Sequence, residues 1–486
     1  IFDPENRLNP GNIVEPGPIE SISESTRIRP HDRNTTVLPA DTYFDYRDQH
    51  GFGGAIEMCN GAGVCRKKQG GTMCPSYMGT LDERHSTRGR ANALRLTLTG
   101  QFDQSGNHQG SSPWSNPDTI ETLDLCLSCK ACKAECPSNV DVARLKAEYT
   151  AQRYREQGGP PLGALAMGHI RALNRMGSLT PKLANMVASS APMKWLTAKV
   201  LRIDPRRELP PFATSLARSF ARGDRKPPKA GAQSDDLRPA VALFGDCFTM
   251  FNEPIVGQSS KRLLEAFGYR VLLADVGCCA RAMISNGLLD QARDTIDRTV
   301  AKLGPWMESE GLRALLFAEP SCLSAIADDW QMLHTGASHE AKRRIAERSF
   351  LIEDFLEKHW DDHPQRPAFV RSIGDDPEVV LHQHCHQRAL LGGESGVGIM
   401  TRACESTRVL DAGCCGMAGA FGYSKDRYDL SMRIGERVLL PTARGLAGSG
   451  VMVAPGTSCR HQLREGAGVQ ALHPVEFLEQ RLSRGD

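Results

Sequence analysis

Apolar and polar residues follow three different patterns along this chain of 486 residues. Residues 1–150 contain few long periodic segments and many Gly, Pro and Asn residues, which predicts loops and short helices. Between residues 160 and 220, apolar residues recur every three or four positions and are interrupted by Pro181 and Pro192, which predicts several short amphipathic helices. From Ala240 onward, short apolar strands alternate with helical segments, an order typical of a parallel sheet covered by helices.

The strand and helix pattern after residue 240 occurs twice. Four cysteines of the first copy correspond to four in the second, in the pairs Cys247 and Cys385, Cys278 and Cys414, Cys279 and Cys415, and Cys322 and Cys459. The two numbers in each pair differ by 138, 136, 136 and 137. A long and nearly constant period predicts a duplicated domain rather than an array of short repeats.

We therefore expect a multidomain protein of the α+β to α/β class. A helical, loop-rich domain with clustered cysteines should precede a duplicated α/β domain with parallel sheets. The expected segments are 1–20, the end of a domain that began earlier; 21–150, the cysteine-containing domain; 151–223, a helical connector; 224–239, a linker; 240–360, the first repeat; and 361–486, the second repeat.

Charge and hydropathy narrow the function. Lys and Arg number 59 and Asp and Glu 57, so the net charge of +2 gives no electrostatic reason to expect a nucleic-acid partner. No apolar run approaches the roughly 18 residues of a membrane-spanning helix, and the N-terminus has no secretion-signal pattern. We expect a cytoplasmic protein, in which sixteen cysteines indicate metal binding rather than disulfides.

One stretch carries the clearest chemical signal. Within Leu123–Asp141, "LDLCLSCKACKAECPSNVD", the residues Cys126, Cys129, Cys132 and Cys136 have the spacing C-x2-C-x2-C-x3-C-P. This is the spacing of bacterial ferredoxins, in which three cysteines of the run hold one [4Fe-4S] cluster. The fourth ligates the other cluster when two are present.

A stretched version of this motif, with three cysteines, lies upstream at residues 59–74. Exchange of the last ligand between the motifs would give one site Cys126, Cys129, Cys132 and Cys74, and the other site Cys59, Cys65 and Cys136. The second site is one thiolate short, so it holds a three-iron cluster, uses a non-cysteine ligand such as His85, or is absent. Zinc bound by the same thiolates is the alternative for both sites.

In the duplicated region, each cysteine or cysteine pair follows the end of a predicted strand. Because the carboxyl ends of parallel strands share one edge of a sheet, the four thiols of each repeat should converge there. Either they hold a further cluster, or they are buried core residues kept from an ancestral site. His382, His384 and His386 are expected to alternate along a strand beside Cys385, with either a metal or proton-transfer role or ordinary hydrogen bonds.

These motifs together carry a family resemblance. The patterns C-x30-CCA-x41-C and C-x28-CCG-x42-C resemble the CCG domains of heterodisulfide reductase subunits and of the iron–sulfur subunit of glycolate oxidase. Family members often end the motif in CxxC, whereas Glu319 and Gly456 occupy those positions here. With "FDPENRLNPGNIV", "GAIEMCNGAGVCRKKQGGTMCPSY" and "HSTRGRANALRL", the whole chain is similar to the C-terminal half of fused FAD and iron–sulfur dehydrogenases. Those enzymes act on D-lactate, glycolate or D-2-hydroxyglutarate.

The resemblance implies that the chain is the iron–sulfur portion of an FAD-dependent D-2-hydroxy-acid dehydrogenase. It would hold one [4Fe-4S] cluster, with a second cluster and a further one in the CCG repeats left open. FAD and the substrate site would lie in a preceding domain or a flavin subunit, so no catalytic residue is expected in this chain.

The resemblance also implies that electrons pass singly from reduced flavin to a quinone or a carrier protein. The cytoplasm, including the inner face of the membrane, is the expected location, and a homo-oligomer is left open. Two alternatives remain: a heterodisulfide-reductase-like or quinone-reducing subunit, and a zinc-stabilised scaffold without a redox role.

Overall fold

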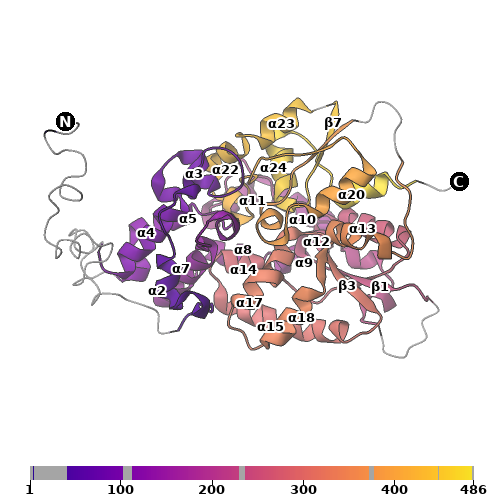
Figure 1. Ribbon diagram of the computed structural model, residues 1–486, viewed down its shortest axis with the longest axis horizontal. Coiled ribbons are helices and arrows are strands. Elements are labelled where there is room, and N and C mark those ends of the chain that lie inside the picture. Colours follow the sequence, from indigo (N-terminus) through magenta and orange to yellow (C-terminus); the bar gives the residue numbers. More distant parts are fainter. Residues whose placement is uncertain are drawn as a thin grey trace.

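The structure is a computed structural model that describes residues 41–101, 112–228, 236–370, 377–446 and 448–483, together with Pro4. The expected end of a preceding domain at residues 1–20 lies, apart from Pro4, outside the described residues. In Figure 1, the cysteine-rich helices of the N-terminal region form one end of the molecule, and two sheets with their helices form the other.

Short helices and loops make up the N-terminal region, as its composition predicts. In chain order they are η2 (Arg47–Gln49), α2 (Gly51–Glu57), η3 (Val64–Arg66), α3 (Pro75–Thr80), η4 (Glu83–His85), α4 (Thr87–Leu98), η6 (Pro113–Ser115), α5 (Pro117–Asp124), α6 (Ala131–Glu135) and α7 (Val142–Glu156). Ser86 caps α4 by accepting a hydrogen bond from the Gly89 N–H, and Asp141 caps α7 by accepting one from the Arg144 N–H. These caps fix where the two longest helices begin, beside the cysteine loops.

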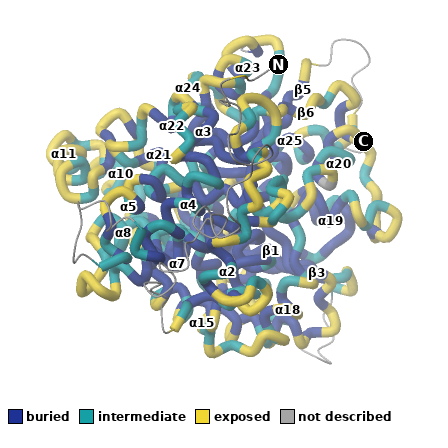
Figure 2. The backbone as a smooth tube through the Cα atoms, turned by 60° about the vertical axis from the view of Figure 1, so that its left-hand side comes forward, coloured by how far each residue is buried: buried dark blue, intermediate teal, exposed yellow. Residues whose placement is uncertain are grey.

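The helices expected between residues 160 and 220 are present. They are α8 (Leu162–Gly168), α9 (Ile170–Gly177), α10 (Pro181–Ser189) and α11 (Ala191–Val200), followed by η7 (Leu216–Ser219) and η8 (Gly223–Arg225). Pro181 and Pro192 lie in the first turns of α10 and α11, where the proline ring is tolerated. Figure 2 shows α10 and α11 at one edge of the molecule, largely in the colour of exposed residues.

A four-stranded parallel sheet follows, with the strand order β2-β1-β3-β4. Its strands are β1 (Ala240–Phe244), β2 (Arg270–Ala274), β3 (Leu312–Phe317) and β4 (Ser349–Leu351). Val241 and Leu243 of β1 pack into one core, whereas Ala242 and Phe244 pack into another. The sheet is therefore covered on both faces, which explains why its strands are almost continuously apolar.

The helices of this first sheet unit (residues 240–360) surround the sheet. They are α12 (Cys247–Phe251), α13 (Pro254–Ala266), α14 (Arg281–Ser285), α15 (Leu289–Met307), α16 (Pro320–Ser324), the π-helical η9 (Ala325–Asp329), α17 (Trp330–Met332), α18 (His339–Glu347), α19 (Ile352–Lys358) and η10 (Trp360–Asp362).

A second parallel sheet, with the order β6-β5-β7, belongs to the second sheet unit (residues 377–483). Its elements are β5 (Glu378–Leu381), the π-helical η11 (Gln387–Leu391), α20 (Ser395–Ala403), β6 (Thr407–Val409), α21 (Ala420–Tyr423), α22 (Tyr428–Gly435), α23 (Leu439–Gly445), β7 (Gly450–Val453), α24 (Thr457–Ala467) and α25 (Pro474–Gln480). The order matches β2-β1-β3, with the first strand of each unit at the centre. This agrees with a duplication, and the exact domain boundaries stay predictions.

One local expectation is wrong. Strand β5 ends at Leu381, so His382, His384 and His386 do not alternate along a strand. His382 and His384 lie in the segment after the strand, and His386 lies in the helical turn that begins at Cys385. His386 there contacts Ser324 of the first sheet unit and the carbonyl of Ser128.

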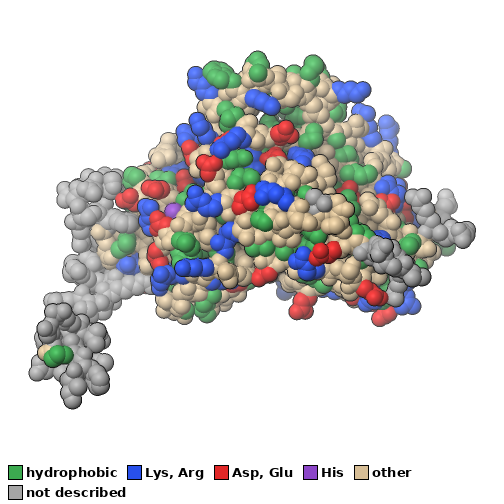
Figure 3. Space-filling model, turned by 90° about the horizontal axis from the view of Figure 1, so that it is seen from above, with side chains coloured by type: hydrophobic (Ala, Val, Ile, Leu, Met, Phe, Trp, Pro, Cys, Tyr) green, Lys and Arg blue, Asp and Glu red, His purple; other side chains and the backbone are tan. Residues whose placement is uncertain are grey.

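The two sheet units pack together through helices, with α19 against α20 and α13 against α25. Figure 2 shows buried segments running through the middle of the molecule, and Figure 3 shows a lobe projecting from the body at the top of the view. In the part of the chain that the structure describes, no helix has the length and apolar character needed to span a bilayer.

Candidate metal centres

Four cysteines from two separate segments surround one small cavity. Cys126 and Cys129 come from the loop before α6, Cys132 from α6 itself, and Cys74 from the residue before α3. Three of them are buried and Cys126 is partly buried. The structure therefore brings together the four thiols that the exchanged ferredoxin motif groups at one site.

The loops around this cavity aim hydrogen-bond donors at sulfur. Cys74, Ser128 and Lys130 have left-handed backbone conformations, with φ of 55°, 52° and 61°. The Ser128 N–H lies 3.4 Å from Cys126 Sγ, and Cys74 Sγ lies 3.0 Å from the Thr87 backbone nitrogen and 2.9 Å from the Thr87 hydroxyl oxygen. Four gathered thiols with such donors fit the ligand set of a [4Fe-4S] cluster.

Burial of these thiols has an electrostatic consequence. It raises the pKa of Cys74 to about 11 and holds the pKa of Cys129 and Cys132 well above the usual value. The thiols therefore keep their protons unless a cation compensates the thiolate charge. Metal binding at this site has to release protons, as is general for cysteine ligands.

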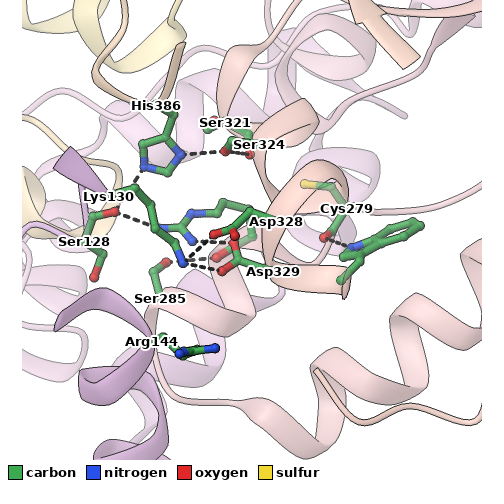
Figure 4. A network of polar contacts seen from close by, with 12 residues as sticks. Ser128, Lys130, Arg144, Cys279, Ser285, Ser321, Ser324, Asp328, Asp329 and His386 are labelled. Atoms are coloured by element: carbon green, nitrogen blue, oxygen red, sulfur yellow. Dashed lines mark hydrogen bonds and ion pairs between the residues drawn. The ribbon is translucent and has the colours of Figure 1, made fainter. Parts of the chain in front are cut away.

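Residues 126–130, which we call the cysteine loop, end in a lysine that is buried among carboxylates (Figure 4). The Lys130 side chain is 2% exposed, and its Nζ lies 3.1 Å from Asp141 Oδ2, 2.9 Å from Asp328 Oδ2 and 2.8 Å from Asp329 Oδ1. Burial lowers the pKa of Lys130, but the three carboxylates outweigh burial and hold it well above the usual value. The loop thus carries a fixed positive charge tied to the first sheet unit.

Both sheet units also hold the Ser128 carbonyl of this loop. Arg281 donates to Ser128 O at 2.8 Å and to Asp329 Oδ2 at 2.8 Å. Because a carbonyl can only accept, His386 Nε2 donates to Ser128 O at 3.1 Å. The other nitrogen, Nδ1, then accepts from the Ser324 hydroxyl at 2.6 Å. No sequence motif reveals this network, because Arg281 and His386 lie 153 and 258 residues from Ser128.

The second cysteine trio is less enclosed. Cys65 is buried, whereas Cys59 and Cys136 are partly buried. Arg88 donates to the Gly61 carbonyl at 3.4 Å, in the loop between Cys59 and Cys65. Glu83 and, more weakly, Cys65 and Cys59 raise the pKa of this guanidinium. The trio therefore has a cation next to it.

His85, the non-cysteine ligand considered for this trio, forms a hydrogen bond through one of its two ring nitrogens. Its Nδ1 shares a hydrogen bond of 2.8 Å with the Thr80 hydroxyl. Burial and then Arg90 lower its pKa, while Asp82 raises it. The hydrogen bond at Nδ1 leaves Nε2 available to a metal, as is usual for histidine ligands. His85 as the non-cysteine ligand of the trio therefore stays a prediction.

The cysteines of the first sheet unit converge at the carboxyl edge of the sheet, as expected. Cys247 begins α12, Cys278 and Cys279 follow β2, and Cys322 lies in α16. The sulfurs of Cys247 and Cys278 are 3.8 Å apart, and those of Cys279 and Cys322 are 3.1 Å apart. All four side chains are buried.

These four thiols line a cavity of about 190 Å³ between the two sheet units. Cys385 and Tyr423 of the second unit form part of its wall, and so do Met167 and Ile170 of the connector. Leu127 lines both this cavity and the smaller one around Cys74. The two cavities therefore lie next to each other, with Leu127 of the cysteine loop in the wall of both.

The cysteines of the second sheet unit form a connected group. The thiols of Cys385, Cys414, Cys415 and Cys459 lie close enough together to shift one another's pKa. Cys414 holds the pKa of Cys385 at about 7, below its usual value. Burial and then Cys385 raise the pKa of Cys129, which places this group beside the cysteine loop.

His382 lies beside Cys415 in the same group. It is 1% exposed, and neither ring nitrogen has a hydrogen-bond partner among the described residues. A buried imidazole with unpartnered nitrogens next to thiols is a donor suited to a metal.

The two positions that depart from CxxC have structural explanations. Glu319 caps α16 through the Ser321 N–H and accepts a hydrogen bond of 2.9 Å from the Thr457 N–H of the second unit. A Cβ atom at Gly456 would lie 2.3 Å from His384 Cδ2. Glu319 thus joins the two units, and Gly456 leaves no room for a thiol unless His384 moves.

Comparison with known proteins agrees with this geometry. Residues 58–141 match the family model of a 4Fe-4S dicluster domain. This matched segment contains all seven cysteines of the two N-terminal groups.

Within the described ranges, no three His, Cys, Asp or Glu side chains come close enough together to hold a single metal ion.

Three curated relatives extend the similarity beyond the dicluster domain. A subunit of the anaerobic glycerol-3-phosphate dehydrogenase of Escherichia coli (strain K12) is 26% identical over 357 residues, 71% of this chain and 83% of that protein. D-2-hydroxyglutarate dehydrogenase of the same strain is 23% identical over 519 residues, 98% of this chain and 48% of that protein. The glycolate oxidase iron-sulfur subunit of this strain is 23% identical over 450 residues, 88% of this chain and 95% of that protein.

The chain thus spans about half the length of the D-2-hydroxyglutarate dehydrogenase that it matches. No solved structure gives a significant match. The recognition of an iron–sulfur half of such a dehydrogenase, drawn from the cysteine motifs, is confirmed.

Proposed function

We propose that this chain is the electron-transfer portion of an FAD-dependent D-2-hydroxy-acid dehydrogenase and passes electrons one at a time from reduced flavin to an external acceptor. The single observation that carries this proposal is the succession of cysteine groups through the molecule. Glu135, the neighbour of Cys136, accepts hydrogen bonds from the N–H groups of Thr72 and Met73, just before Cys74. His386, the neighbour of Cys385, donates to the carbonyl of Ser128, the neighbour of Cys129. Cys385 in turn lines the cavity that holds the thiols of the first sheet unit.

A reduced flavin holds two electrons, whereas an iron–sulfur cluster exchanges one at a time. The clusters would therefore let the flavin release its electrons singly to an acceptor. The residues of this chain have three tasks. Cys126, Cys129, Cys132 and Cys74 bind the first cluster, with backbone N–H groups directed at their sulfurs. Cys59, Cys65 and Cys136 are assigned to the second site. The strand-end cysteines of both units, with His382 beside Cys415, are assigned to a further cluster.

The flavin, the hydroxy-acid site and the natural partners belong to the proposal as well. We assign FAD to a preceding domain or a flavin subunit and the acceptor to a quinone or a carrier protein. The apolar cavity between the sheet units favours a small-molecule acceptor, which keeps the quinone-reducing or heterodisulfide-reductase-like subunit as a second candidate. We place the chain in the cytoplasm, peripheral at the inner face of the membrane, and leave a homo-oligomer open.

The decisive experiment counts iron and acid-labile sulfide in the chain purified without oxygen. Cys129→Ser should lose about four irons and the matching EPR signal, because it removes one ligand of an enclosed site. Cys404→Ser is the matched control, since Cys404 is buried but lies outside all the cysteine groups. Unchanged iron content in Cys129→Ser contradicts the ligand assignment. Zinc without sulfide in the unaltered chain would establish the scaffold instead.

A further inference from the structure

The helical connector exposes an unusual amount of apolar surface. Across the described residues, seventeen large apolar side chains are exposed, and eleven of them lie between Leu162 and Leu209. Leu179 exposes 72% of its surface, Met176 67% and Met186 64%. A concentration of this kind marks a surface that another body covers.

The exposed side chains share faces of neighbouring helices. Leu183, Met186 and Val187 are three and four positions apart on α10, which places them on one side of that helix. Trp195 and Leu196 are exposed on α11, which packs beside α10. Neither helix has a buried residue. We call residues 162–203 the connector lobe.

The connector lobe carries charge of one sign. Residues 157–203 contain no Asp or Glu and six Lys or Arg residues. Arg171 and Arg202 pair with acidic side chains of the sheet units. The other four are exposed, and they are Arg175, Lys182, Lys194 and Lys199. At the top of Figure 3, the projecting lobe shows hydrophobic and basic side chains together.

We propose that the connector lobe docks on the surface of an anionic lipid bilayer. Apolar side chains that include a Trp, beside basic residues without any acid, are the composition of helices that lie in the membrane interface. Each basic residue near the surface adds attraction to anionic headgroups. A protein partner fits this surface less well than a bilayer does. A patch that carries only positive charge beside large exposed apolar side chains matches the extended anionic surface of a bilayer.

This inference deepens the peripheral location proposed above and would orient the large cavity. Met167 and Ile170, which belong to the lobe, also line the cavity that contains Cys247 and Cys278. Docking would bring this wall of the cavity toward lipid. An acceptor dissolved in the bilayer would then have a short route to the thiols.

Vesicle binding by the whole 486-residue chain tests the proposal. The chain is sedimented with vesicles of phosphatidylcholine alone and with vesicles that also contain anionic phosphatidylglycerol. We expect binding to the anionic vesicles only, weakened by salt. Met186→Glu should abolish it, and Lys182→Gln and Lys194→Gln should each weaken it about fivefold.

Matched controls lie outside the lobe. Leu237→Glu changes a side chain that is 97% exposed, and Lys302→Gln changes an exposed lysine of α15. Both should bind vesicles as the unaltered chain does. In addition, lipid-borne quenchers should reduce Trp195 fluorescence, and Trp195→Phe should remove that quenching.

Three results would overturn the proposal. One is binding that Met186→Glu and Leu237→Glu reduce equally. Another is absence of vesicle binding together with a dimer that Met186→Glu dissociates, because a second copy would then cover the lobe. The third is capture of a flavin-containing chain by the lobe without affinity for lipid. The iron content of Cys129→Ser is independent of all three, so the two proposals fail separately.

Discussion

The two sheet units share a topology but hold the cysteine loop in opposite ways. The first unit approaches the loop with charged groups, Arg281, Asp328 and Asp329, which enclose Lys130. The second unit approaches the same loop with an imidazole, His386, and a thiol, Cys385. The two units therefore contact the cysteine loop from two sides that differ in charge. We call this arrangement of the two units around the loop the clamp.

This difference has a physical rationale. A negative cluster is stabilised by a nearby cation, and a cation buried within a protein has to be paired with carboxylates. The first unit supplies two of those carboxylates, Asp328 and Asp329. The second unit stays uncharged where it meets the thiols, because burial and then Arg281 hold the pKa of His386 well below its usual value.

The largest effect is expected from removing the charge at the centre of the clamp. Lys130→Met leaves the carboxylates of Asp141, Asp328 and Asp329 buried without their common cation. Loss of one partner from a buried ion network costs about 3–5 kcal/mol. Urea unfolding followed by circular dichroism should show that loss, together with reduced iron retention during purification.

Lys133→Met is the control for this prediction. Lys133 also pairs with Asp328, but its side chain is 34% exposed. Its replacement should cost about 1 kcal/mol or less, because exposed pairs contribute little. Equal losses in the two variants would show that the burial of Lys130 does not matter.

The next effect compares equivalent positions after the two cysteine pairs. Ala280 and Gly416 both have left-handed backbones, with φ of 62° and 89°. A Cβ atom at Gly416 would lie 2.2 Å from Ser431 O. Gly416→Ala should therefore destabilise the chain by about 2–4 kcal/mol through strain and overlap.

The reverse change in the first unit should be mild. Ala280→Gly relieves the left-handed strain but loses a buried methyl group and makes the unfolded chain more flexible, so stability should change by about 1 kcal/mol or less. Differential scanning calorimetry of both variants measures the contrast. Similar shifts in the two variants would mean that the two turns are equivalent.

Sequence reasoning reached the thiols but not what surrounds them. The ferredoxin spacing placed Cys126, Cys129 and Cys132 together, and the exchange rule added Cys74, because such motifs act through local loops. The parallel strands and the convergence of cysteines at the sheet edges also followed from the pattern. The partners of Lys130 could not be found this way, since Asp328 and Asp329 lie in a π-helical turn almost 200 residues away.

One further contact could not be predicted for the same reason. Glu319 was noted only as a missing cysteine, although it caps α16 and bonds to Thr457 of the second unit. The contact between Glu319 and Thr457 is tertiary, and one sequence contains no signal for it.

The seam between the two sheet units should respond to pH through Glu353. This residue of α19 is 1% exposed, and both carboxylate oxygens lack hydrogen-bond partners among the described residues. Burial, followed by the neighbouring Asp354, raises the pKa of Glu353 to about 8. The folded chain therefore holds a proton that the unfolded chain releases near its ordinary pKa of 4.5.

The sign of the pH dependence follows from this. The stabilisation is complete below the unfolded pKa and is lost as the pH rises toward about 8. The loss is at most about 1.4 kcal/mol per pH unit. Glu353→Gln should remove this dependence and make the chain more stable than the unaltered one at the alkaline end.

Urea unfolding at acidic and alkaline ends of that range measures the effect. Glu347→Gln is the control, because Glu347 is 65% exposed and should leave the pH dependence unchanged. An unaltered pH slope in Glu353→Gln would show that this carboxyl is not the group that titrates at the seam.

The smallest effect is expected on the neutral side of the clamp. The Ser324 hydroxyl is buried and donates to His386 Nδ1, which leaves Nε2 to hold the Ser128 carbonyl. Ser324→Ala leaves Nδ1 of His386 without its donor and should lower the free energy of unfolding, measured in urea, by about 1 kcal/mol. Ser285→Ala, whose hydroxyl bonds only to carbonyls of its own helix, should cost less. If Ser324→Ala were as harmful as Lys130→Met, the two sides of the clamp would contribute equally, and the contrast between the units would be one of chemistry without a difference in strength.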